Sequence, residues 1–132
     1  MALVVPVSWG ELLDKISILQ IKSERLDNGP KKENVCHELA LLERVRDRQL
    51  PDGVDLAEVL AGLRQANEQL WEIEDQIRIC EKNQQFDDNF IRLARAVYVT
   101  NDRRAALKYR LNALLGSEIV EEKAYANYAC ES

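Results

Sequence analysis

Residues 67–110 read NEQLWEIEDQIRICEKNQQFDDNFIRLARAVYVTNDRRAALKYR and contain two long helical patterns joined by a short polar stretch. In the second pattern, apolar and polar residues recur at steps of three and four, so they share one helix face. These residues are Phe90, Leu93, Val97, Asn101, Arg104, Lys108, Leu111 and Leu115. Burying Arg104 and Lys108 without partners would cost on the order of several kcal/mol. We therefore expect a polar seam, in which both cations either pair with internal carboxylates or border a cavity that takes water or an anion.

The first pattern predicts a helix over residues 55–82 that pairs with a helix over residues 87–115. Its apolar residues alternate steps of three and four, which is typical of an antiparallel helix pair. They are Leu56, Val59, Leu63, Ala66, Leu70, Ile73, Ile77 and Cys80. The connection at residues 83–86 is short enough to force a hairpin. Residues 55–86 are rich in acids and residues 87–115 in bases, and this opposite charge favours docking of the two helices.

Two shorter helices are expected before the hairpin, over residues 9–28 and 31–49. Ser8 and Glu11 have the capping-box spacing at the start of the first helix, and Gly29 with Pro30 should end it. One face of the second helix carries Val35, Leu39, Leu42 and Val45. Both shorter helices are expected to cover one side of the hairpin.

The predicted fold class is therefore all-α, a four-helix bundle dominated by the long hairpin, with close to no strand. We expect a single helical domain over residues 1–132, because 132 residues of which 46% are hydrophobic suffice for one core. After Gly116, residues 117–128 should dock on the bundle as one or two turns, held by Tyr125 and Tyr128. The side that the shorter helices leave uncovered would suit a homodimer.

Charge and the N-terminal residues limit the possible partners. The net charge of -5 argues against a general nucleic-acid binder, which needs a basic surface, although a local basic face on one helix stays possible. Residues 1–9 lack a cationic stretch, and Pro6 interrupts their apolar run. Neither a signal peptide nor a membrane span is predicted, and a cytoplasmic location is expected.

Cysteine and histidine usage predicts no cofactor and no metal site. Cys36, Cys80 and Cys130 are far apart and odd in number, without the spacing of a disulfide framework or a zinc site. Cys80 should be part of the core. Cys36 adjoins His37, the only histidine, but neighbouring helix residues point about 100° apart, so a nucleophile and base pair is not favoured. His37 is expected at the surface.

A second stripe, beside the apolar seam of residues 55–82, mixes an amide, an aromatic ring, a carboxylate and a guanidinium. Its members are Asn67, Trp71, Glu74 and Arg78. In one interpretation Trp71 packs and Glu74 pairs with Arg78. In the other, the stripe is a polar wall facing the seam. The candidate anion-binding residues are then Arg104, Lys108, Asn101, Trp71 and Glu74. Asp14 and Lys15 are expected in solvent, because charged residues at helix starts usually face water.

Four stretches resemble a family of small helical bacterial proteins classed as a domain of unknown function. They are VPVSWGELLDKISILQIKSERL (5–26), NEQLWEIEDQIR (67–78), FIRLARAVYVTNDRRAALKYRLN (90–112) and GSEIVEEKAYANY (116–128). The resemblance implies a bacterial helical module associated with genes for surface carbohydrate assembly and glycosyl transfer, and it brings no catalytic residues. The family's recurring blocks fall on Ser8, Glu11, Lys15, Asn67, Trp71, Glu74, Asp75, Arg78, Asn101, Asp102, Arg104 and Lys108.

A second, partial likeness concerns the first helix alone. Its DKISIL run and the later SERL are similar to the opening helix of the all-helical chorismate mutases, which hold a dicarboxylate with arginines and lysines. The further basic hairpin of those enzymes has no counterpart in residues 31–49, where Arg44, Arg46 and Arg48 adjoin Leu50 and Pro51. Fold analogy alone does not establish function.

Three function hypotheses follow. The leading one is a non-enzymatic accessory or anion-binding module linked to cell-surface carbohydrate assembly, with a small anionic molecule or a protein as partner. The second is a small chorismate-mutase-like enzyme that uses the polar seam electrostatically, with Glu74 or Asp102 as general base. The third is a structural homodimer whose seam consists of internal salt bridges. We lean against an enzyme.

Overall fold

The structure is a computed structural model that describes residues 1–128, so Cys130 lies outside the described residues. Its helices are α1 (Trp9–Arg25), α2 (Pro30–Gln49), α3 (Ala57–Lys82) and α4 (Asp88–Leu114). No strand occurs within residues 1–128, which confirms the predicted all-α class. In the same part of the chain, no helix combines the length and the apolarity that crossing a bilayer requires.

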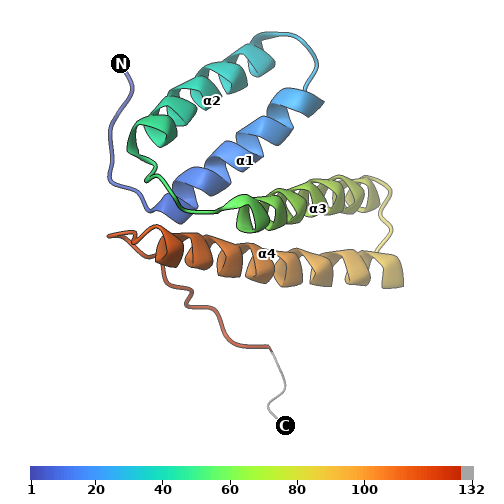
Figure 1. Cartoon of the computed structure of the whole chain (residues 1–132). Helices are drawn as coiled ribbons and strands as arrows, with labels where there is room; N and C mark the ends of the chain where they lie inside the picture. Colours follow the sequence, from blue (N-terminus) through green and yellow to red (C-terminus); the bar gives the residue numbers. More distant parts are fainter. Residues whose placement is uncertain (129–132) are drawn as a thin grey trace.

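The helices are arranged with α1 in the middle. Figure 1 shows α3 and α4 as an antiparallel hairpin, with α1 beside it and α2 on the far side of α1. The expectation that both shorter helices cover the hairpin therefore holds only for α1, since α2 packs against α1 instead. No residue of α2 is fully buried, because its apolar face meets a single helix.

The core lies where α1 crosses the hairpin. A cluster of seven buried side chains joins α1, the start of α3 and the end of α4 there. Its members are Leu12, Leu13, Ile16, Leu56, Val59, Leu63 and Leu111. Farther along the hairpin, Leu70, Ile73 and Ile77 of the predicted seam are only half-buried. This change coincides with the end of α1, where the Arg25 guanidinium lies 5.5 Å from the centre of the Trp71 ring. The seam thus loses burial beyond the end of α1, although Cys80, as expected, and Leu93 are buried again near the turn of the hairpin.

The predicted helix starts agree with the observed ones to within two residues. The Ser8 hydroxyl accepts a hydrogen bond from the Glu11 N–H at 3.0 Å and caps α1. The Asp87 carboxylate caps α4 in the same way, at 3.2 Å from the Phe90 N–H. However, α3 begins at Ala57 instead of residue 55. The side chain of Asp55 accepts from the Ala57 N–H at 3.1 Å, so Asp55 stays outside the helix.

The first helix ends three residues before the predicted Asn28. Leu26 has an extended backbone, with φ -77 and ψ 142, and its N–H makes the last helical hydrogen bond, to the Lys22 carbonyl at 2.9 Å. Gly29 has φ 152 and precedes Pro30, the first residue of α2, where a missing N–H costs nothing. Residues 26–29 are thus all needed to reverse the chain between α1 and α2.

The segment after α4 is docked but not helical, so the predicted turns at residues 117–128 were wrong. At its start, the Ser117 hydroxyl donates to the Ile119 carbonyl at 2.7 Å in place of a helical turn. The Trp9 N–H donates to the Ser117 hydroxyl at 3.2 Å, which ties the start of the segment to α1. Farther along, Lys123 pairs with Asp102. The Tyr128 ring lies 5.2 Å from the Tyr98 ring, whereas Tyr125 is largely exposed.

Two glycines provide a matched test of how closely α1 approaches α4. A Cβ atom on Gly10 would lie 2.5 Å from the Lys108 carbonyl oxygen, whereas one on Gly62 would lie 3.4 Å from the Leu107 side chain, an ordinary contact. We expect Gly10→Ala to lower the free energy of unfolding by about 1–3 kcal/mol. Gly62→Ala should instead raise it by up to about 1 kcal/mol, because alanine favours a helix interior. Urea denaturation measures both, and equal effects would contradict the close approach at Gly10.

Candidate functional site

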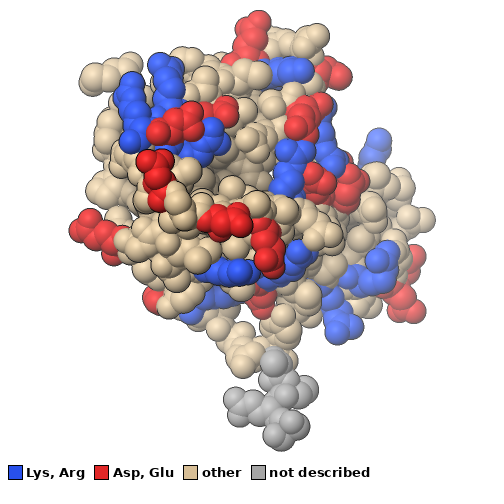
Figure 2. Space-filling model, in the orientation of Figure 1, with Lys and Arg blue, Asp and Glu red and all other residues tan. Residues whose placement is uncertain are grey.

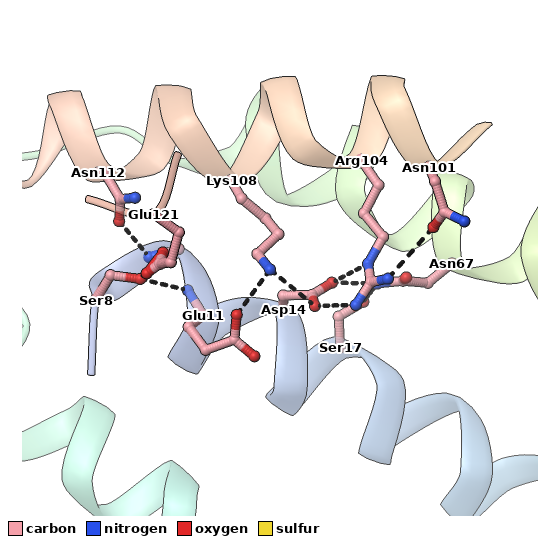
Figure 3. Close-up of polar contacts among 11 residues, drawn as sticks. Ser8, Glu11, Asp14, Ser17, Asn67, Asn101, Arg104, Lys108, Asn112 and Glu121 are labelled. Atoms are coloured by element: carbon pink, nitrogen blue, oxygen red, sulfur yellow. Dashed lines mark hydrogen bonds and ion pairs between the residues drawn. The ribbon is translucent and has the colours of Figure 1, made fainter. Parts of the chain in front are cut away.

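The polar seam runs between α1 and α4 and begins where the two helices approach most closely. The Gly10 N–H donates to the side-chain oxygen of Asn112 at 2.7 Å. Next to it, the Ser8 hydroxyl donates to the Glu121 carboxylate at 2.5 Å. Figure 3 shows these contacts at one end of a row that continues through Glu11 and Asp14. Backbone and side-chain groups at the start of α1 are thus tied both to α4 and to the C-terminal segment.

Asp14 lies at the centre of the seam, so the expectation that it faces water was wrong. It is 1% exposed. The Arg104 Nε donates to Asp14 Oδ1 at 2.9 Å, and Arg104 Nη2 donates to the other oxygen, Oδ2. These hydrogen bonds raise the pKa of Arg104 above its ordinary value, against the opposing effect of burial. Asp14 and Arg104 therefore form a bidentate ion pair whose carboxylate is buried, the geometry in which arginine binds carboxylates most strongly.

A signal for the burial of Asp14 is present in the sequence. Gly10, Asp14, Ser17 and Ile21 follow one another at steps of four, three and four, and all four are buried. The small residues on this face allow α4 to come close, and Asp14 is the single charge among them. Its neighbour Lys15, in contrast, is exposed as expected and pairs with Glu38 at 3.0 Å.

The amide of Asn67 completes the pairing of Asp14 from α3. Its Nδ2 donates to Asp14 Oδ1 at 3.0 Å and approaches the Ser17 hydroxyl at 3.3 Å. Asn67 is buried, so the second stripe does meet the seam at this residue. Within residues 1–128, no buried side-chain nitrogen or oxygen lacks a hydrogen-bond partner. The seam is therefore a satisfied network, which polar groups in a protein interior require.

Lys108 is held differently from Arg104. Its Nζ lies 2.7 Å from the Glu11 carboxylate and 3.8 Å from Asp14 Oδ2. The Glu11 side chain is 44% exposed, whereas that of Asp14 is 1% exposed. The main partner of Lys108 can therefore reach water, and the partner of Arg104 cannot.

The five candidate anion-binding residues line two hollows that share a wall. A hollow of about 450 Å³ is bordered by Trp71, Glu74, Asn101 and Arg104. A second one, of about 710 Å³, is bordered by Asn101, Arg104 and Lys108 and by residues of the C-terminal segment. Asn101 and Arg104 thus separate the two hollows, and Lys108 does not border the one that contains Trp71.

The carboxylates proposed as general bases both have cationic partners. Glu74 pairs with Arg78 at 3.2 Å, as the first interpretation of the second stripe expected. Asp102 pairs with Lys123. Within residues 1–128, no group of three or more acidic, histidine or cysteine side chains is close enough to hold a metal ion. In the structure, the Glu74 and Asp102 carboxylates are therefore both members of ion pairs.

Sequence reasoning missed a long groove between α4 and the C-terminal segment. It encloses about 880 Å³, and its walls include the four tyrosines of the chain. They are Tyr98, Tyr109, Tyr125 and Tyr128. Tyr98, Ala105 and Tyr109 recur at steps of seven and four, which indicates one outward face of α4. The opposite wall could not be found in this way, because a segment without regular structure has no periodicity.

Comparison with known proteins identifies the family. The model of a family of unknown function, DUF6165, matches residues 3–131, so the chain belongs to that family. No curated protein and no solved structure matches it. The match covers all the stretches from which the resemblance was inferred.

Breaking the buried ion pair from one side tests whether it holds the fold together. We expect Arg104→Met to lower the free energy of unfolding by about 3–5 kcal/mol, because it leaves the Asp14 carboxylate buried without its main partner. The double variant Asp14→Leu with Arg104→Met should lose much less than the sum of the two single variants. Urea denaturation of the four proteins measures the coupling. Additive effects would show that the pair contributes nothing as a pair.

Proposed function

We propose that this member of the DUF6165 family is a non-enzymatic module that binds a small anionic molecule in the hollow bordered by Asn101, Arg104 and Lys108. The observation that carries the proposal is the convergence of these three side chains, from successive turns of α4, on one hollow of about 710 Å³. Tyr109 and Tyr125 border the same hollow. Two cations, an amide and aromatic rings together suit a ligand with a charged group and a ring.

An anion can bind because Arg104 and Lys108 are held by carboxylate partners that differ in exposure. Arg104 keeps Nε and Nη2 on Asp14, and its Nη1 makes only a long contact of 3.5 Å to Asn101. Lys108 can exchange Glu11 for a ligand, because the Glu11 side chain is 44% exposed and its carboxylate can turn to water when a ligand takes its place. The ligand would thus receive hydrogen bonds from Lys108 and Arg104 Nη1 without disturbing the buried pair.

Sugar phosphates are the first ligand class to test. A phosphate group suits Lys108 as a point charge and the free edge of the Arg104 fork. A sugar ring suits the tyrosine rings and the amides of Asn101 and Asn112. The resemblance to proteins associated with surface carbohydrate assembly points to the same class. The proposal accordingly describes an accessory module that holds a phosphorylated sugar for another protein.

A second candidate function is a purely structural one. It is favoured by the fact that both seam cations already have carboxylate partners, Asp14 for Arg104 and Glu11 for Lys108. In that case the only role of the polar seam is to hold α1 against the α3–α4 hairpin. The enzyme hypothesis has less support, because its two candidate bases are ion-paired.

Thermal unfolding in the presence of anions tests the proposal. Inorganic phosphate, sugar phosphates and nucleotide sugars should raise the melting temperature by a few degrees at about a hundredfold excess over the dissociation constant, which corresponds to about 2.7 kcal/mol. Lys108→Gln should abolish this shift and leave the unliganded stability nearly unchanged, since the charge that it frees is half exposed.

Lys15→Gln is the matched control. It removes the same charge from an exposed pair, with Glu38, away from the hollow. If this variant lost the shift as Lys108→Gln did, the anions would be acting through overall charge. Absence of any shift in the wild type, combined with strong destabilisation by Arg104→Met, would favour the structural candidate.

A further inference from the structure

The outer face of α4 carries a row of arginines that the polar seam does not use. Arg92, Arg95, Arg103 and Arg110 recur at steps of three, eight and seven, and all are exposed. Val99 and Ala106, also exposed, fill the two gaps and complete one helical stripe. Arg92 and Arg110 are 18 positions apart, or about 27 Å at 1.5 Å per residue. We call it the arginine row.

The arginine row differs from the inner face of the same helix in how its charge is compensated. On the inner face, Arg104 and Lys108 have carboxylate partners. Arg103 instead bonds the neutral amides of Gln65 and Gln69, and Arg92 bonds that of Asn89. Among residues 1–128, no carboxylate forms an ion pair with any member of the row. Figure 2 shows basic and acidic side chains intermixed over the lower part of the molecule, where α4 runs.

We propose that the arginine row is a docking surface for an acidic helical segment of a partner protein. Each guanidinium presents a planar fork that matches a carboxylate, and carboxylates at steps of three and four on a helix would follow the row. Such a helix would run along α4 beside α3, where the α3 side chains that reach the row are the neutral amides of Gln65 and Gln69.

Other occupants fit less well. A second copy related by a two-fold axis would place the arginine row against itself, since such an interface uses the same patch on both subunits. A nucleic acid is an extended polyanion and would meet the net negative charge of the molecule as well as the row. Figure 1 shows the C-terminal segment projecting from α4 on the side away from α1 and α2. The exposed Glu118 and Glu122 of this segment would repel a flat anionic bilayer.

Fluorescence anisotropy with defined probes tests the proposal. The probe is a labelled, alanine-based peptide of about 20 residues, long enough to be helical, with glutamates at steps of three and four. We expect the wild type to bind it, and binding to weaken as salt screens the charges. Replacing Arg92, Arg95, Arg103 and Arg110 by glutamine should weaken binding about tenfold or more, because four exposed pairs are lost together.

The matched control replaces the α2 cations Lys31, Lys32, Arg44 and Arg48 by glutamine, which changes the net charge equally on another helix. Loss of binding only in the α4 variant supports the proposal. Equal loss in both variants, or no binding by the wild type, overturns it. Tighter binding of duplex DNA or of phosphatidylglycerol vesicles through the same arginines would also overturn it, in favour of that occupant. Circular dichroism of both variants must show unchanged helix content for the comparison to count.

Discussion

The contact between Asp14 and Arg104 is the one on which the packing of α1 against the hairpin depends. A carboxylate that is 1% exposed cannot be left unpaired, and only Arg104, with help from Asn67, reaches both of its oxygens. Apolar contacts alone would tolerate a sliding or rotated α1. A bidentate pair between fixed backbones tolerates neither. The pair therefore selects one register, and the close approach at Gly10 is possible only in that register.

This arrangement gives α4 two charged faces with different roles. Its inner face supplies Arg104 and Lys108 to a network whose polar groups are satisfied by other parts of the chain. Its outer face supplies the arginine row, which has no carboxylate partner within residues 1–128. The net charge of -5 gives no indication that α4 has two basic faces with different roles. Charge that is compensated inside a protein contributes to its architecture, whereas charge left uncompensated on a rigid helix is available for recognition.

The hairpin could be predicted from the sequence because its apolar repeat is long and regular, and the capping residue Ser8 indicated where α1 begins. The site was harder to predict. Periodicity placed Arg104 on a buried face but could not identify Asp14 as its partner, because that pairing depends on how two helices meet. Charged residues near a helix start usually face water, and Asp14 is an exception that its small neighbours permit. The groove wall formed by residues 121–128 has no periodic signal at all.

The unequal exposure of the two seam carboxylates explains how one network can serve both stability and binding. A ligand that displaced Asp14 from Arg104 would leave the buried Asp14 carboxylate unpaired. The free-energy cost, on the order of several kcal/mol, would cancel the binding free energy of a weak ligand. A ligand that competes with Glu11 releases a half-exposed carboxylate to water, at a cost of about 1 kcal/mol or less. Binding at Lys108 is thus compatible with an intact core, and binding at the buried edge of Arg104 is not. A ligand would therefore enter from the side of the C-terminal segment, where Lys108 borders the hollow.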